Sequence, residues 1–94
     1  MIRRGEIWWA SLPEPRRSEP GNRRPVLVVL SDEFNRSAIQ TVMVVAISSS
    51  LRFAEAPGNV RLPGRRTGLP RDAVANVSQV LTVDKRSLAD RVRP

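Results

Sequence analysis

Short segments of alternating or continuous hydrophobic residues follow one another along the chain, each bounded by residues that favour turns. Segments of this length and pattern predict β-strands rather than helices. The expected strands cover residues 5–12, 26–31, 41–48, 59–63 and 73–83. The third strand is apolar throughout its middle, which predicts burial on both faces at the centre of a sheet. The last strand is expected to bend near Ser78.

The connections between these strands predict little helix. Residues 13–23 contain three prolines and one glycine, so they cannot form a helix, and connections of this length in small domains are commonly functional. Residues 31–38 predict a turn or one helical turn, and Asp84 is expected to cap a final helical turn over residues 85–92. Five or six short strands predict a mainly β fold, a small antiparallel barrel forming a single domain over residues 1–94.

The composition excludes several kinds of chemistry. The chain of 94 residues has no cysteine, no histidine and no tyrosine, so disulfides, thiolate nucleophiles and imidazole acid–base catalysis are excluded. Any catalysis must use carboxylates, hydroxyls, arginine or backbone amides. The net charge is +7, and all but one of the 16 basic residues are arginine. This cationic excess favours a polyanionic partner, most often nucleic acid, over a merely basic protein.

Two features of the sequence bear on where the protein acts. No apolar run is long enough to span a bilayer. The N-terminal segment contains Glu6 where a signal peptide would need a continuous apolar core. A cytoplasmic protein that does not act at a membrane is therefore expected.

Arg23 and Arg24 stand close before the apolar run 26–30. Charged groups rarely lie at the mouth of a buried strand without a partner. Either the two arginines are the solvated end of the strand, or one of them is held there to meet an anion.

Four segments together resemble the MazF/PemK toxins, the RNA-cleaving halves of type II toxin–antitoxin modules. They are "RRGEIWWASL", "SEPGNRRPVLVVLSDEFN", "TVMVVAIS" and "GLPRDAVANVSQVLTVDKRSL". The resemblance covers residues 2–88 in the family's order and spacing. It implies an SH3-like barrel that forms a homodimer. It also implies a metal-independent endoribonuclease without a cofactor that cuts single-stranded RNA at short sequences.

In this family the ribose 2′-hydroxyl attacks the adjacent phosphate, which leaves a cyclic phosphate and a 5′-hydroxyl. The resemblance also implies a MazE-like antitoxin whose acidic, flexible tail occupies the RNA groove. Arg24, directly before Pro25, matches the family's arginine and would hold the scissile phosphate. Ser48 falls where the family usually has a threonine, and its hydroxyl would donate to a phosphate oxygen. Glu19 would act as a base or would position Arg24. Further RNA contacts are expected from Arg16, Arg17, Arg23, Ser78 and Gln79.

Each of these roles has a plainer alternative. Arg24 could be a solvated strand end, Ser48 a turn hydroxyl, Glu19 a solvated loop acid and Arg23 a surface charge.

The other candidate residues are weaker. Trp8 and Trp9 could offer a base-stacking face, although one is expected in the core and the other in a dimer or lid contact. Arg65, Arg66 and Arg71 could extend the basic surface, although simple solvation is favoured for each.

Three positions depart from the family's pattern. Ser78 stands where several members have an acidic residue, Leu81 stands where an arginine is common, and Ala73 stands where a serine is common. The family's C-terminal helix is expected to be short or missing, which would weaken a dimer that depends on it. Two alternatives therefore stay open: an RNA-binding module that does not cut, and a non-catalytic toxin on the same barrel, resembling the gyrase inhibitor CcdB.

Overall fold

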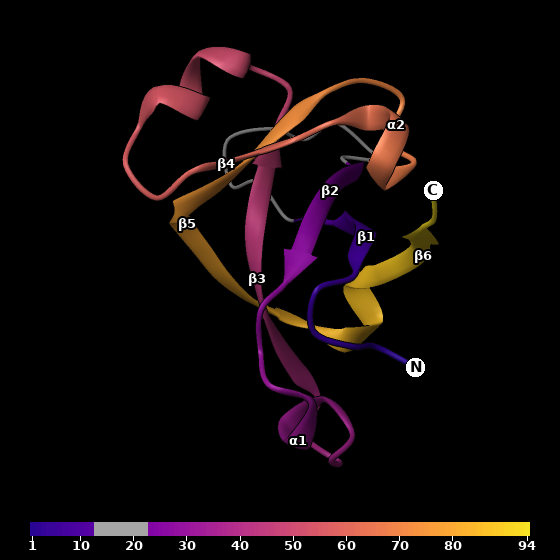
Figure 1. Cartoon of the computed structure of the whole chain (residues 1–94). Helices are drawn as coiled ribbons and strands as arrows, with labels where there is room; N and C mark the ends of the chain where they lie inside the picture. The colour runs from indigo at the N-terminus through magenta and orange to yellow at the C-terminus, as the bar shows by residue number, and fades with distance from the viewer. Residues whose placement is uncertain (13–22) are drawn as a thin grey trace.

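The computed structural model describes residues 1–12 and 23–94. Its six strands are antiparallel and form one sheet in the order β4-β5-β3-β2-β1-β6, which curls around its own core (Figure 1). The strands are β1 (Ile7–Ser11), β2 (Arg23–Val28), β3 (Thr41–Ser48), β4 (Val60–Leu62), β5 (Ala73–Asp84) and β6 (Leu88–Val92). The helical turns are α1 (Asp32–Asn35), η1 (Leu51–Glu55), α2 (Gly64–Thr67) and η2 (Lys85–Ser87). No described helix is long and apolar enough to cross a membrane.

The mainly β architecture predicted from the sequence is confirmed. The alternation in β1 sends neighbouring side chains to opposite faces of the sheet, and a hydrophobic cluster covers each face. The first cluster contains Val26, Val28 and Val44, with Trp8 packed against it. The second contains Ile47 and Leu69 among others, with Trp9 and Leu27 packed against it.

The prediction for the third strand is only partly confirmed. β3 lies between β5 and β2 inside the sheet, as expected for a central strand. Its burial on both faces holds only towards its C-terminal half, because Met43 is 39% exposed. Met43 pairs with Thr82 of β5, and both residues line an open hollow on the surface with Phe34.

Two boundaries differ from the predictions. β2 begins at Arg23 rather than Val26, because Arg23 and Arg24 continue the ladder with Ser11 and Ala10 of β1. The final helical turn predicted over residues 85–92 is wrong beyond residue 87: Asp84 does cap η2 through the backbone N–H of Arg86, but a strand follows. β6 pairs with β1, and this distant ladder prevails over local helix formation.

Candidate active site at the ends of β2 and β3

Arg24 and Ser48 belong to strands that run antiparallel side by side. The register pairs Val26 with Ala46 and Val28 with Val44. Extending it by two residues sets Arg24 opposite Ser48 on the same face of the sheet, because side chains on one face recur every second residue. Arg24 and Ser48 therefore occupy corresponding positions on one face of β2 and β3, just where the buried part of this face ends.

A large hollow of about 670 Å³ opens beside this pair. It is lined by Leu12, Arg24, Pro25, Ala46, Ile47, Ser48, Phe53, Asn76, Ser78, Gln79, Val80 and Leu81. Four of the described candidate residues are thus in one place: Arg24, Ser48, Ser78 and Gln79. Leu81 also lines it, so two of the positions that depart from the family's pattern belong to the site itself.

Ser78 and Gln79 reach the large hollow because β5 bulges between Ala75 and Val80. The bend predicted near Ser78 lies in this bulge. Ala75 pairs with Ile47 but Val80 pairs with Val45, so the residues between them are looped out of the ladder with β3. The buried Asn76 holds this bulge, since its Oδ1 accepts a hydrogen bond of 2.7 Å from the Ser78 hydroxyl.

Asn59 supports the bulge from the neighbouring connection. Its Oδ1 accepts a 2.9 Å hydrogen bond from the backbone N–H of Val77, and its Nδ2 donates to the carbonyl oxygen of Phe53, also at 2.9 Å. Asn59 therefore ties the bulge to η1, whose Phe53 forms another wall of the large hollow.

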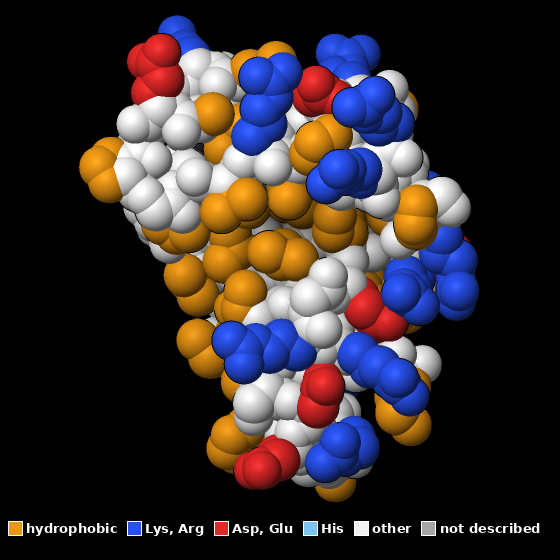
Figure 2. Space-filling view, in the orientation of Figure 1, with side chains coloured by type: hydrophobic (Ala, Val, Ile, Leu, Met, Phe, Trp, Pro, Cys, Tyr) orange, Lys and Arg blue, Asp and Glu red, His pale blue; other side chains and the backbone are white. Residues whose placement is uncertain are grey.

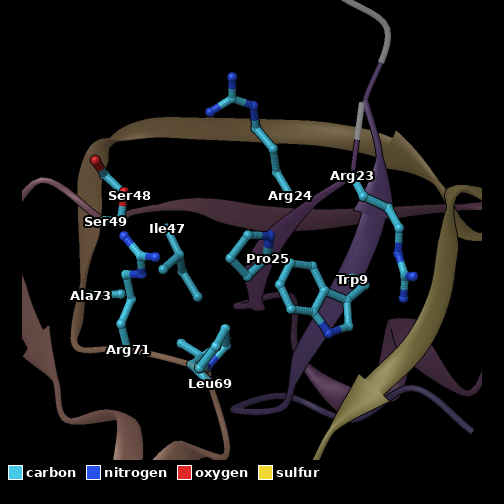
Figure 3. Close-up of a pocket in the computed structure, with 11 residues that line it drawn as sticks. Trp9, Arg23, Arg24, Pro25, Ile47, Ser48, Ser49, Leu69, Arg71 and Ala73 are labelled. Atoms are coloured by element: carbon cyan, nitrogen blue, oxygen red, sulfur yellow. The ribbon is translucent and has the colours of Figure 1, made fainter. Parts of the chain in front are cut away.

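A second, smaller hollow of about 350 Å³ adjoins the same pair of residues. It is lined by Trp9, Arg23, Arg24, Pro25, Ile47, Ser48, Ser49, Leu69, Pro70, Arg71 and Ala73 (Figure 3). Both hollows share the edge formed by Arg24, Pro25, Ile47 and Ser48. Arg24 and Ser48 thus stand at the junction of two openings, where an extended ligand could pass from one into the other.

Arg23 is more than the plain surface charge considered from the sequence. Its guanidinium makes a 2.8 Å ion pair with Asp90 and lies over the Trp9 ring, 5.3 Å from the ring centroid. Asp90 belongs to β6, so the contact joins residues far apart in sequence. One of the two tryptophans was expected in the core, and Trp8 is that residue. The dimer or lid contact expected of the other stays a prediction. Trp8 packs against the first cluster and donates to Glu6 at 3.1 Å, whereas Trp9 lines the smaller hollow.

Arg71 is the site residue whose position sequence reasoning missed, since solvation was favoured for it. Figure 3 shows its side chain rising toward Ser48 and Ser49 from the side opposite Trp9. The signal available in the sequence was the stretch "LPRD", in which Pro70 fixes the backbone beside it. The adjacent Asp72 holds this connection in place. The N–H of Gly64 donates to Asp72 at 2.8 Å, and this bond, with a contact from Arg61, lowers the pKa of Asp72 below its ordinary value.

No carboxylate of the described part of the chain lines either hollow. The lining carries arginine guanidinium groups and hydroxyls, a set that suits an anionic ligand. The proposed base Glu19 and the expected RNA contacts Arg16 and Arg17 lie outside the described residues. The geometry therefore bears on how a phosphate would be held and not on which group removes a proton.

Known proteins match this chain over almost its whole length. Residues 3–93 match the family described as the PemK-like, MazF-like toxin of type II toxin–antitoxin systems. "Endoribonuclease MazF6" of Mycobacterium tuberculosis is 49% identical over 98% of this chain and 81% of that protein. "Endoribonuclease EndoA" of Bacillus subtilis is 36% identical over 98% of this chain and 78% of that protein.

A solved structure, an endoribonuclease in complex with its cognate antitoxin from a mycobacterial species, shares the fold. It superposes with a TM-score of 0.75 at 21% identity, over 98% of this chain and 77% of its own. The chain belongs to the PemK-like, MazF-like toxin family of type II toxin–antitoxin systems.

Proposed function

We propose that this protein is the toxin of a type II toxin–antitoxin system and an endoribonuclease that cuts single-stranded RNA between the two hollows. Its family and the names of its relatives support the class of activity. The finer proposal is that cleavage needs no metal. In it the 2′-hydroxyl attacks the adjacent phosphate, the bond to the 5′-oxygen of the next nucleotide breaks, and a cyclic phosphate and a 5′-hydroxyl result.

One observation carries this proposal most directly: Arg24 and Ser48 both line the two hollows, at the edge that these hollows share. A phosphate at this edge would leave one flanking nucleotide in each hollow. The planar guanidinium of Arg24 can bond to two phosphate oxygens, and the Ser48 hydroxyl can donate to one.

These donors address the main difficulty of the reaction. Negative charge grows on the phosphate oxygens as the 2′-oxygen adds, and donors fixed in advance stabilise that charge. Arg24 and Ser48 project from strands held by backbone ladders, so little reorganisation is needed at the moment of attack. The 2′-hydroxyl still needs a proton acceptor, and the leaving oxygen needs a donor. Glu19 remains our candidate for the first role.

Two partners belong to the proposal besides RNA. The first is a second copy of the chain. Apolar side chains of β5 and β3 are exposed, with Val77 at 44%, Val80 at 48% and Met43 at 39%. Figure 2 shows hydrophobic side chains in a broad patch across the middle of the face where these strands lie. Such a patch is typical of protein–protein contact, and a homodimer would cover it.

The second partner is an antitoxin with an acidic, flexible tail of the MazE kind. The net charge of +7 and the guanidinium groups around the hollows favour such a segment, whose carboxylates would replace the RNA phosphates. The single domain of residues 1–94 would act in the cytoplasm, where its RNA substrate is.

The test is to incubate the purified protein with a long RNA in EDTA and to map the new 5′ ends. The proposal predicts discrete cuts that leave 5′-hydroxyl ends. A second substrate carries one 2′-deoxy nucleotide directly upstream of a mapped cut, and cleavage there should stop while neighbouring sites are still cut. RNA binding without cleavage would instead support a binding module, which the lack of a lining carboxylate among the described residues would explain.

A further inference from the structure

The smaller hollow differs in chemistry from the large one. Its apolar residues come from four parts of the chain: Trp9 on β1, Pro25 on β2, Ile47 on β3, and Leu69 after α2. Arginine and serine side chains make up nearly half of its lining. Figure 3 shows the rings of Trp9 and Pro25 together on one side, with Arg71 on the opposite side. Ser48 and Ser49 lie on the same side of the hollow as Arg71, and Arg23 lies beyond Trp9 on the other side.

We propose that this hollow binds one unpaired base of the RNA, stacked on the wall of Trp9 and Pro25, and that Arg71 selects the base by its edge. The inference rests on the proposed function, because it makes the hollow the place of the nucleotide next to the phosphate held at Arg24 and Ser48. Trp9 and Arg71 thereby become residues that determine sequence specificity.

The stacking wall is fixed before the ligand arrives. Trp9 and Pro25 are direct neighbours in the β1–β2 register, so their rings stand side by side on one face of the sheet. Arg23 flanks the indole on the side away from Arg71, and its ion pair with Asp90 keeps it there. Stacking on such a preformed aromatic wall strengthens the binding of single-stranded RNA largely whichever base it is, because every base has an aromatic face.

Discrimination between bases must therefore come from a polar group at the opposite side. Arg71 has no hydrogen-bond or ion-pair partner within residues 1–12 and 23–94, whereas Arg23 and Arg61 are paired with carboxylates. A guanidinium only donates hydrogen bonds. It therefore donates to O6 of guanine or O4 of uracil, whereas adenine and cytosine present an amino group at the same position, which also donates. The hollow should prefer the two carbonyl bases.

The first test uses short single-stranded RNAs that carry 2′-O-methyl groups throughout, so that they bind but cannot be cut. Binding should quench tryptophan fluorescence in the wild type. Trp9→Phe should abolish the quenching, and Trp8→Phe, which alters the core tryptophan, should retain it. Quenching that survives in Trp9→Phe, or that disappears only in Trp8→Phe, would overturn the stacking wall.

The second test measures the affinity of these RNAs when the single base at this position is changed. The wild type should favour guanine and uracil over adenine and cytosine by about tenfold. Arg71→Gln should remove this preference, because an amide both donates and accepts. Arg66→Gln, an exposed arginine of α2 that lines neither hollow, should keep it. An unchanged preference in Arg71→Gln would overturn the proposal, as would an equal loss of affinity for all four bases.

Neither measurement depends on catalysis. If the protein does not cut RNA, the proposed function is wrong. The binding measurements would still show whether Trp9 and Arg71 form a site for one base.

Discussion

Arg24 and Ser48 come to the same edge of the two hollows only because β2 and β3 pair in one register. A shift of one residue would turn either side chain to the opposite face of the sheet, away from its partner. Local features of the sequence do not show which residues of two strands lie opposite each other. Pro25 and the apolar run after it indicate a strand, and the resemblance singles out both residues, but their opposition follows from the ladder between β2 and β3.

Substitutions of Ser48 test whether its hydroxyl is what matters. Ser48→Thr keeps the hydroxyl and should retain cleavage, whereas Ser48→Ala should reduce the cleavage rate about a hundredfold, the usual effect of losing one donor to a developing oxyanion. Single-turnover rates with one short RNA measure both. A full rate in Ser48→Ala would show that the hydroxyl only serves the turn, where it accepts from the N–H of Ser50.

At the level of the elements, β5 combines regular pairing with a bulge. Its first residues pair with both β3 and β4, and its bulge then carries Ser78 and Gln79 to the large hollow. The alternation of the sequence predicted one strand with a bend. The buried Asn76 that forms the bend was not identified, because its partners Ser78 and, through Val77, Asn59 become neighbours only in the folded chain.

Removing the Asn76 amide should destabilise the bulge. Asn76→Ala leaves the Ser78 hydroxyl without its protein acceptor and opens a small space in the interior. We expect a loss of about 1–2 kcal/mol of unfolding free energy. Urea denaturation measures this loss, with Gln79→Ala as a matched control, since Gln79 is exposed on the same bulge. Equal stability of Asn76→Ala and the wild type would mean that the ladder alone shapes this part of β5.

The connection between α2 and β5 makes stability depend on pH. Bonds from the N–H of Gly64 and from Arg61 lower the folded-state pKa of Asp72. Ionised Asp72 therefore stabilises the fold above the unfolded pKa of about 4, and this contribution is lost as the pH falls through the lower folded value. Asp72→Asn should be less stable than the wild type near neutral pH and should lose less stability between about pH 5 and pH 2. Urea denaturation of both proteins across this pH range measures the difference in their free energies of unfolding. Parallel profiles of stability against pH would contradict the role assigned to Asp72.

For the whole molecule, hydrophobic patterning predicted much of the fold because most strands are short, rich in β-branched residues and bounded by turns. The failures have a common physical cause. β6 forms in a segment that locally favours a helical turn because β1 offers it a ladder, and Arg23 joins β2 because β1 continues alongside. Arg71 lines the smaller hollow because the connection between α2 and β5 passes beside it. All three outcomes depend on contacts between distant residues.

The exposed face of β5 leads to a prediction about assembly. If this face joins two copies, Val80→Asp should place two charges in the interface and yield a monomer. Ala89→Asp, on β6 at the other edge of the sheet, should leave the dimer intact. Light scattering during gel filtration measures the mass of each variant. A monomeric wild-type protein would contradict the prediction, and so would a dimer that tolerates Val80→Asp.

The measurement that tests the site most directly is the single-turnover cleavage rate of one RNA in EDTA, for the wild type, Arg24→Ala and Arg36→Ala. Arg36 lies after α1 and lines neither hollow, so it controls for the loss of one positive charge. We expect a loss of about a thousandfold in Arg24→Ala and a nearly unchanged rate in Arg36→Ala. Equal rates for the two variants would contradict it, because Arg24 would then not hold the phosphate that is cut.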